Sequence, residues 1–260
     1  MTMPDTSGTR INGVTLTAMN LMQNGSISVG APPSVDSMVY IPGNNGSFDA
    51  TLRNVDGQAY FDRRQVTLPI AAAGTMADVA SAKAAIGAYV GKQVNLYDAR
   101  NAGTWRGPLS ISAWTDVQED WNMLFASTAT LTVNAEPGMI LPQRTVALTN
   151  GENDNIMVLG NMMAWPTFTL TPTGSSNSIS VSVDMEFGTM EPTGIVGYMQ
   201  TSSITGTVVL DCYRGLMTNG NIRLPVSLTS FFPYLLPGYM KVTLGGCSSG
   251  VMTYEPRVML

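Results

Sequence analysis

The sequence predicts a mainly β protein of two domains: an N-terminal β-sandwich with one α-helix and a hairpin, and a C-terminal antiparallel β-sandwich. Three observations lead to this prediction. Short segments in which apolar and polar residues alternate recur along most of the chain, as in half-buried strands. Residues 75–90 alone have helical spacing. Two prolines and a glycine within residues 135–142 mark a domain boundary, which gives domains at residues 1–138 and 139–260.

The N-terminal stretch is predicted to consist of short strands and turns. Asn12-Gly13 has the residue types of a tight hairpin turn. We expect residues 15–18 to pair with residues 26–29, and residues 35–41 to form a strand.

Residues 41–70 are predicted to form a hairpin unit. The stretch opens with a turn at residues 42–46, because glycine and asparagine tolerate positive φ, and continues as a strand over residues 47–53. Asp56-Gly57 is a second turn. A half-buried strand follows at residues 65–70, with its end marked by Pro69.

The helix has a start signal, an apolar face and a stop signal. Thr75 is the expected N-cap and Asp78 completes a capping box. Gly91 is the expected C-terminal stop. The spacing places on one face Met76, Val79, Ile86 and Val90.

The remaining strands follow from alternation. The first domain has three, at residues 92–97, 105–113 and 124–134. Residues 150–161 are expected to be a turn-rich approach to the second sandwich. Its strands are predicted at residues 165–170, 179–183, 205–210, 222–228, 239–244 and 251–254.

The composition argues against several functions. The chain has no histidine, which excludes Ser-His-Asp and Cys-His nucleophile systems and zinc sites with histidine ligands. The closest carboxylates, Asp116, Glu119 and Asp120, form one local cluster and are expected in a solvated turn. We therefore expect no enzyme activity, no cofactor and no metal. A net charge of −5 does not favour nucleic-acid binding. Only 12% of residues are charged, which suits a subunit that buries much of its surface in an assembly.

Two further features concern the ends of the chain. The first 14 residues lack the pattern of a secretory signal, and no apolar run is long enough to span a membrane, so membrane insertion is not expected. Cys212 and Cys247 are expected to be buried thiols, with a single disulfide as the alternative.

The order of several motifs resembles the distal tail protein (Dit) family of long-tailed bacteriophages (siphophages). In the first half these are the Ile-Pro-Gly turn at residues 41–46, the Leu68-Pro69-Ile70 strand, the segment 91–97 and the segment 106–109. In the second half they are residues 165–170, 209–213, 232–238 and 256–259. Departures from the family pattern are Asn44, where arginine is frequent, and Cys212.

The resemblance implies a ring-forming first domain and a galectin-like β-sandwich as the second. It implies a structural virion protein: a homohexameric ring in the baseplate hub that joins the tail tube protein to the tail-tip or tail-associated protein. Such a ring is located at the virion tail tip and assembled in the host cytoplasm. Arg53, Arg63 and Arg64 are the expected subunit-interface residues. The alternative is a carbohydrate-binding β-sandwich, with candidate aromatic platforms at Trp105, Trp114, Trp121 and Trp165.

Overall fold

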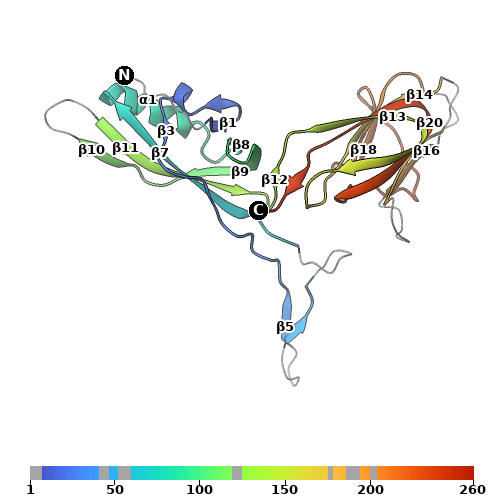
Figure 1. Cartoon of the computed structure of the whole chain (residues 1–260), viewed down its shortest axis with the longest axis horizontal. Helices are drawn as coiled ribbons and strands as arrows, with labels where there is room; N and C mark the ends of the chain where they lie inside the picture. Colours follow the sequence, from blue (N-terminus) through green and yellow to red (C-terminus); the bar gives the residue numbers. More distant parts are fainter. Residues whose placement is uncertain are drawn as a thin grey trace. The chain divides into compact units, whose positions relative to one another are not determined.

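The computed structural model describes residues 8–40, 47–51, 60–118, 125–174, 178–185, 194–199 and 204–260. It confirms the mainly β class, with α1 (Met76–Gly87) as the single α-helix of the described residues (Figure 1). The chain divides into two compact units, Met1–Met139 and Ile140–Leu260.

The first unit is built on one antiparallel sheet. Its long strands lie in the order β8, β9, β11, β7, and the short N-terminal strands extend it at both ends. The bounds are β1 (Arg10–Ile11), β2 (Val14–Thr15), β3 (Met22–Gln23), β4 (Ser28–Val29), β7 (Arg64–Gly74), β8 (Gln93–Asp98), β9 (Gly103–Ile111), β10 (Thr115–Gln118) and β11 (Phe125–Ala135). The three strands predicted within residues 92–134 are confirmed as β8, β9 and β11.

Alternation in the sequence explains the core of this sheet. Val66, Leu68 and Ile70 of β7 are fully buried, while the alternate residues Gln65 and Thr67 are not. Leu131 and Val133 of β11 lie directly opposite Leu68 and Val66. These two facing pairs bury four aliphatic side chains together, and both the cross-strand contacts and the burial stabilise the sheet.

The prediction that Pro69 ends its strand is wrong. β7 continues to Gly74, and Pro69 lies opposite Thr130 within it. The carbonyl of Pro69 accepts a hydrogen bond from the amide of Asn24, at 2.9 Å. The backbone nitrogen of Pro69, which carries no hydrogen, therefore faces the segment between β3 and β4. No strand at that position requires a hydrogen bond from this nitrogen. Proline is tolerated at such edge positions.

Two further predictions for the N-terminal stretch had different outcomes. The Asn12-Gly13 hairpin is confirmed: β1 and β2 pair across it, and both turn residues have positive φ. The pairing of residues 15–18 with residues 26–29 is wrong. Thr17–Met19 form a short 3-10 helix, and β4 pairs with β7 instead. The 11-residue strand β7 offers β4 a longer edge for backbone pairing than the two-residue strand β2 does.

Helix α1 begins as predicted and ends earlier. Thr75 is the N-cap, and the capping box with Asp78 is complete. The helix ends at Gly87, and Gly91, although at φ 77°, lies beyond it in a turn. The buried face consists of Val79, Ala82 and Ile86, whereas Met76 is 67% exposed and Val90 41% exposed. At 3.6 residues per turn, Met76 lies about 90° from the centre of that stripe, and Val90 follows the helix end.

The second unit is one antiparallel sheet whose strands contribute side chains to one hydrophobic core. Its strand order is β16-β15-β20-β14-β17-β18-β19, with β13 paired to β20. The bounds are β13 (Arg144–Val158), β14 (Thr167–Pro172), β15 (Ser178–Met185), β16 (Gly194–Met199), β17 (Val208–Asp211), β18 (Leu216–Asn219), β19 (Ile222–Arg223) and β20 (Gly238–Tyr254). Two short strands lie near its ends, β12 (Met139–Ile140) and β21 (Arg257–Val258). Buried residues of β14 and β15 belong to the same hydrophobic cluster.

Strand β20 pairs with β13, β14 and β15, and its length was not predicted. The expected strands at residues 239–244 and 251–254 are parts of β20, which pairs with β15 up to Gly245 and with β14 from Cys247 onward. Gly246, at φ 72°, provides the bend between the two halves. Residues 150–158 are not a turn-rich approach but the second half of β13. Only Ile222 and Arg223 of the expected strand at residues 222–228 are a strand.

Strand β13 follows the same bend through two register shifts. One lies between Thr149 and Gly151 and the other between Asn153 and Ile156. The side-chain amide of Asn153 donates to the carbonyl oxygens of Thr149 at 2.9 Å, Gly151 at 3.1 Å and Val242 at 3.2 Å. Such bulges strengthen the local twist, and the hydrogen bonds of Asn153 connect the bulged part of β13 to Val242 of β20.

Both cysteines of the second unit are buried free thiols, which agrees with the first of the two predictions for them. In the described part of the chain, no helix is long and apolar enough to cross a membrane.

Candidate functional site

The three arginines predicted at a subunit interface differ in their surroundings. Arg53 lies outside the described residues. Arg63 is exposed, and its guanidinium donates to the carbonyl of Asn134 at 3.2 Å. Its amide donates to the carboxylate of Asp62 at 2.6 Å. Arg63 is therefore on the surface of the first unit.

Arg64, by contrast, is inside the first unit with 3% of its surface exposed. Its Nε donates to the carbonyl of Gly30 at 2.6 Å, and its Nη1 donates to the carbonyl of Pro137 at 3.1 Å. The guanidinium lies over the ring of Trp105, 5.3 Å from the centroid. Burial lowers the pKa of Arg64 from its ordinary value. A side chain in these contacts has a role within its own subunit.

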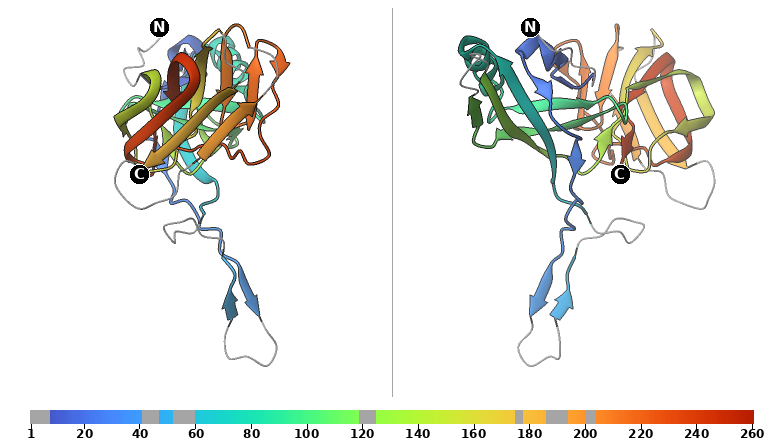
Figure 2. Two further views of the ribbon diagram at one scale, coloured as in Figure 1. Left: turned by 90° about the vertical axis from the view of Figure 1, so that its right-hand side faces the viewer. Right: turned by 60° about the vertical axis from the view of Figure 1, so that its left-hand side comes forward.

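A two-stranded ribbon precedes Arg64 in the chain, and we call it the arm: residues 34–40, 47–51 and 60–62. β5 (Met38–Tyr40) and β6 (Ser47–Asp49) pair antiparallel at its outer part. Toward its root, the amide of Val35 donates to the carbonyl of Tyr60 at 2.7 Å, and the amide of Asp62 donates to that of Pro33 at 2.8 Å. Among described residues β5 and β6 pair only with each other, and Figure 2 shows the ribbon they form.

The arm carries large apolar side chains in solvent. Met38 is 63% exposed and Tyr40 70% exposed, and Val39 between them is exposed as well. Because successive residues of a strand point to opposite faces, β5 places exposed apolar side chains on both faces of the ribbon. An isolated two-stranded hairpin is marginally stable in water. The arm thus has apolar side chains that are typical of a buried strand, and these side chains are exposed in the subunit.

The sequence contains a signal for this surface that the arginine-based prediction missed. Met38, Val39 and Tyr40 are three consecutive large apolar residues, followed by the glycine- and asparagine-rich segment 42–46. A half-exposed strand would alternate. The absence of alternation next to a turn signal is the pattern that distinguishes this segment from a half-exposed strand.

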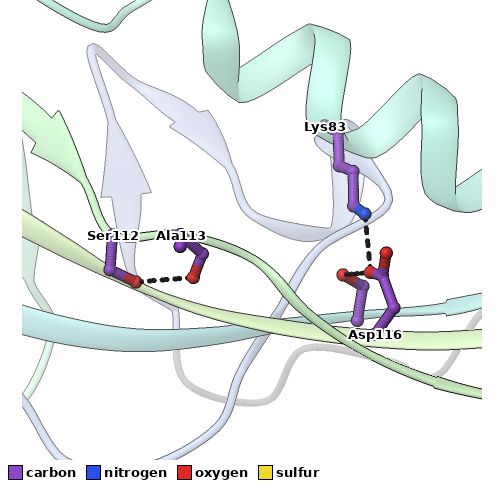
Figure 3. A network of polar contacts seen from close by, with 5 residues as sticks. Lys83, Ser112, Ala113 and Asp116 are labelled. Carbon is purple, nitrogen blue, oxygen red and sulfur yellow. Dashed lines mark hydrogen bonds and ion pairs between the residues drawn. The ribbon is translucent and has the colours of Figure 1, made fainter.

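A polar contact at the other end of the unit joins helix α1 to the sheet. Lys83 Nζ lies 2.7 Å from Asp116 Oδ1, and the hydroxyl of Ser127 donates to the same carboxylate (Figure 3). Lys83 also lies over the ring of Trp114, 5.3 Å from its centroid. Glu119 and Asp120, the neighbours of Asp116 in the predicted carboxylate cluster, lie outside the described residues.

The candidate sugar platforms are not open aromatic surfaces in the described part of the chain. Trp105 is fully buried beneath Arg64, and Trp114 is partly covered by Lys83. Trp165 packs partly buried against the core of the second unit and edge-on to Tyr234, with centroids 5.9 Å apart. Trp121 lies outside the described residues.

Comparison with known proteins gives a result at the level of structure. No protein-family model matches the sequence, and no curated protein matches it either. The structure is similar to that of the SPP1 Dit protein, which is described as a paradigm of the hub adsorption apparatus in phages that infect Gram-positive bacteria. The TM-score is 0.63, and the match covers 96% of this chain and 98% of that chain at 12% identity. The chain has the Dit fold.

A second similar structure is the phage P2 baseplate in its activated conformation with calcium. The match covers 90% of this chain and 91% of that one, at 9% identity and a TM-score of 0.45. This likeness is too distant to support a conclusion about the chain, so the fold assignment rests on the SPP1 protein. The resemblance to the Dit family that the motifs indicate is confirmed by the SPP1 structure at the level of the fold.

The motif residues occupy structural positions within the Dit fold. Residues 91–97 lead into β8, and residues 106–109 lie in β9. In the second unit, residues 232–238 lead into β20, and the amide of Leu235 donates to the carbonyl of Ala164 at 2.8 Å. The segments 91–97, 106–109 and 232–238 therefore take part in strand pairing within each unit.

Proposed function

We propose that this protein is a structural subunit of a phage tail hub, without enzyme activity. In this proposal six copies close into a ring that joins the tail tube protein to the tail-tip or tail-associated protein. The ring is assembled in the host cytoplasm and resides at the virion tail tip. The observation that carries the proposal is the match of the whole chain to the whole SPP1 Dit chain, so both units have counterparts in a hub protein.

The arm supports the assembly part of this proposal. Contiguous apolar residues that stay exposed in a subunit indicate an interaction site, and the arm exposes Val35, Met38, Val39, Tyr40 and Tyr60. In a ring, one surface of each copy meets a different surface of the next. A ribbon with exposed apolar side chains on β5 suits such a heterologous contact, since a neighbouring copy covers them in this proposal. The first unit, which carries the arm, is the ring former in this proposal.

The test is an assembly measurement on the full-length protein with surface variants. Met38→Ser/Tyr40→Ser removes apolar surface from the arm without touching either core. We expect wild type to form a closed ring, by mass photometry or light scattering, alone or with its tail tube and tail-tip partners. The arm variant should keep the melting temperature of wild type and shift toward monomer.

The matched control is Ile222→Ser, a substitution of an equally exposed apolar residue in the second unit; its side chain is 70% exposed. This variant should assemble like wild type. A wild-type protein that remains monomeric at high concentration and in the presence of both partners contradicts the proposal. Equal losses in the arm variant and the control contradict the assignment of the contact to the arm.

Reversal of the charges at Arg63 and Arg64 together is unsuited to this test. Arg64 is buried and makes hydrogen bonds within the first unit. A glutamate there places an uncompensated charge beside two carbonyl groups and damages the fold itself. Arg63→Glu alone, at the exposed position, remains an informative variant for the predicted interface.

A further inference from the structure

Arg64 connects three parts of the first unit that are distant in sequence: the root of the arm, the ring of Trp105 and the backbone at Pro137. We propose that Arg64 is the positioning residue of the arm, which holds the arm root in one place so that the apolar ribbon is presented in a defined direction. This inference rests on the proposed function, because it assigns a role within the assembly contact. Its experiment, however, can be read without any assembly.

The backbone at the arm root is held by the start of β7. One leg of the arm leaves the sheet after Gly30, and the other enters it at Arg64, the first residue of β7. The amide of Gly30 donates to the carbonyl of Gln65 at 2.9 Å, and its carbonyl accepts from Arg64 Nε at 2.6 Å. The amide and the carbonyl of Gly30 are therefore both bound by β7. The two legs are fixed to each other at the point where they leave the sheet.

The same side chain also reaches the end of the unit. A second donor of Arg64, Nη1, is bound by the carbonyl of Pro137, two residues before the unit ends at Met139. The guanidinium thus holds the root of the arm and the segment by which the chain leaves the first unit. Displacement of either segment requires a hydrogen bond of Arg64 to break. The two segments are restrained as a pair.

The arrangement requires the shape of an arginine side chain. A guanidinium is planar and presents several donors in a fixed fork, and its face stacks on aromatic rings. Trp105 supports that face here, while Nε and Nη1 donate to two different carbonyls. Lysine has one compact ammonium on a flexible stem and cannot reproduce these contacts. Desolvation of a cation is costly, and a neutral residue would suffice if the site served only to fill space.

Arg63 provides a matched control in the next position. It is exposed and has the same side chain, but its guanidinium donates to a carbonyl on the surface. Removal of Arg63 tests the loss of a positive charge near the arm root. Removal of Arg64 tests the loss of the hydrogen bonds to the carbonyls of Gly30 and Pro137.

The experiment is amide hydrogen exchange on the full-length protein, comparing wild type with Arg64→Met, Arg64→Lys and the control Arg63→Met. The reporting amides are Gly30, Val35 and Asp62, which donate across the arm root. The reference amides are Leu109 and Ser112, which donate to Lys92 and Thr130 within the sheet. We expect exchange at the reporting amides to be about tenfold faster or more in both Arg64 variants, and unchanged at the reference amides. Arg63→Met should match wild type at both sets.

Three results would overturn the assignment. Equal acceleration at the reporting and reference amides would place the role of Arg64 in the stability of the whole sheet. No acceleration at the reporting amides would show that the hydrogen bonds of the arm root persist without the Arg64 side chain. Failure of both Arg64 variants to fold would likewise make Arg64 a residue of the core and not of the arm.

Assembly is then measured separately on the same proteins. If wild type forms rings, Arg64→Lys should form fewer at equal concentration. If wild type forms no rings, the proposed function fails, but the exchange pattern still decides whether Arg64 positions the arm. The two failures are therefore distinguishable.

Discussion

The ammonium of Lys83 lies 2.7 Å from the carboxylate of Asp116, and this contact fastens helix α1 to the short strand β10. β10 pairs with β11 over only four residues, so hydrogen bonds within the sheet hold it weakly. The hydroxyl of Ser127 on β11 donates to the same carboxylate. Asp116 therefore links three elements of the first unit at one point.

The first prediction concerns the pH dependence of this contact. The hydrogen bonds from Lys83 and Ser127 lower the pKa of Asp116 below its ordinary value. A carboxylate with a lowered folded-state pKa stabilises the protein above its unfolded-state pKa, near 4, and loses that contribution as the pH falls through the folded-state value. We expect wild type to melt at a higher temperature than Asp116→Asn at pH 7, and the difference to shrink as the pH falls below about 4.

Salt provides a second check on the same pair. The side chains of Lys83 and Asp116 are both partly exposed, so 1 M sodium chloride should reduce the difference in melting temperature at pH 7. A difference between the two proteins that is constant in pH and salt would mean that Asp116 acts through shape and not through charge.

The second prediction concerns the start of helix α1. Thr75→Ala removes the hydroxyl that accepts from the amide of Asp78 at 3.2 Å, and should lower the free energy of unfolding by about 1 kcal/mol. Thr75→Ser keeps the acceptor and should cost much less. Denaturant unfolding followed by circular dichroism measures both. Equal losses for serine and alanine would show that the methyl group matters instead of the cap.

The third prediction uses two glycines with opposite surroundings. A Cβ at Gly107 in β9 would collide with the backbone carbonyl of Asn134, whereas a Cβ at Gly87 meets open space. We expect Gly107→Ala to lower the free energy of unfolding by about 1–3 kcal/mol, because a packed backbone cannot retreat. Gly87→Ala should raise it by up to about 1 kcal/mol. Thermal and urea unfolding of the two variants against wild type decide this.

The fourth prediction concerns the thiols. Burial raises the pKa of Cys247 to about 11, and burial together with Asp211 raises the pKa of Cys212 further. Because the thiolate is the reactive form, we expect almost no reaction with Ellman's reagent at pH 8 in the native protein. Two thiols should react in guanidinium chloride without reductant. A count of zero there would indicate a disulfide and contradict the free cysteines of the structure.

Local signals in the sequence predicted those elements whose cause is local. The capping box of Thr75 and Asp78, the Asn12-Gly13 hairpin and the alternation of β7 depend on residues within a few positions of one another. The longest strands were missed for the same reason. Gly151, Asn155 and Gly246 all have positive φ, and such residues usually mark turns, but here they bend strands β13 and β20 that continue beyond them.

The surroundings of the arginines that were predicted at a subunit interface could not be derived from their positions in the sequence. Arg64 has the sequence environment of a surface arginine, with Arg63 beside it. Its burial depends on Trp105 and Pro137, which only the folded sheet brings to it. The arm lies only partly within residues 41–70, which the sequence predicted as a hairpin unit, and its exposed apolar residues Met38 and Tyr40 precede that range. The run of three apolar residues at 38–40 was the local signal for this surface, and it was not used in the prediction.

The pairing of β13 with β20 has a consequence for how the second unit can be handled genetically. Arg144, near the start of this unit, lies opposite Tyr254 near its end, and the amide of Leu141 donates to the carbonyl of Pro256 at 2.8 Å. The chain therefore enters and leaves this unit at neighbouring points. A module of this kind can be joined end to end by a short peptide and reopened at an exposed turn such as Gly220, between β18 and β19, giving a circular permutant with the same core. It can also be exchanged for another module whose ends lie equally close together.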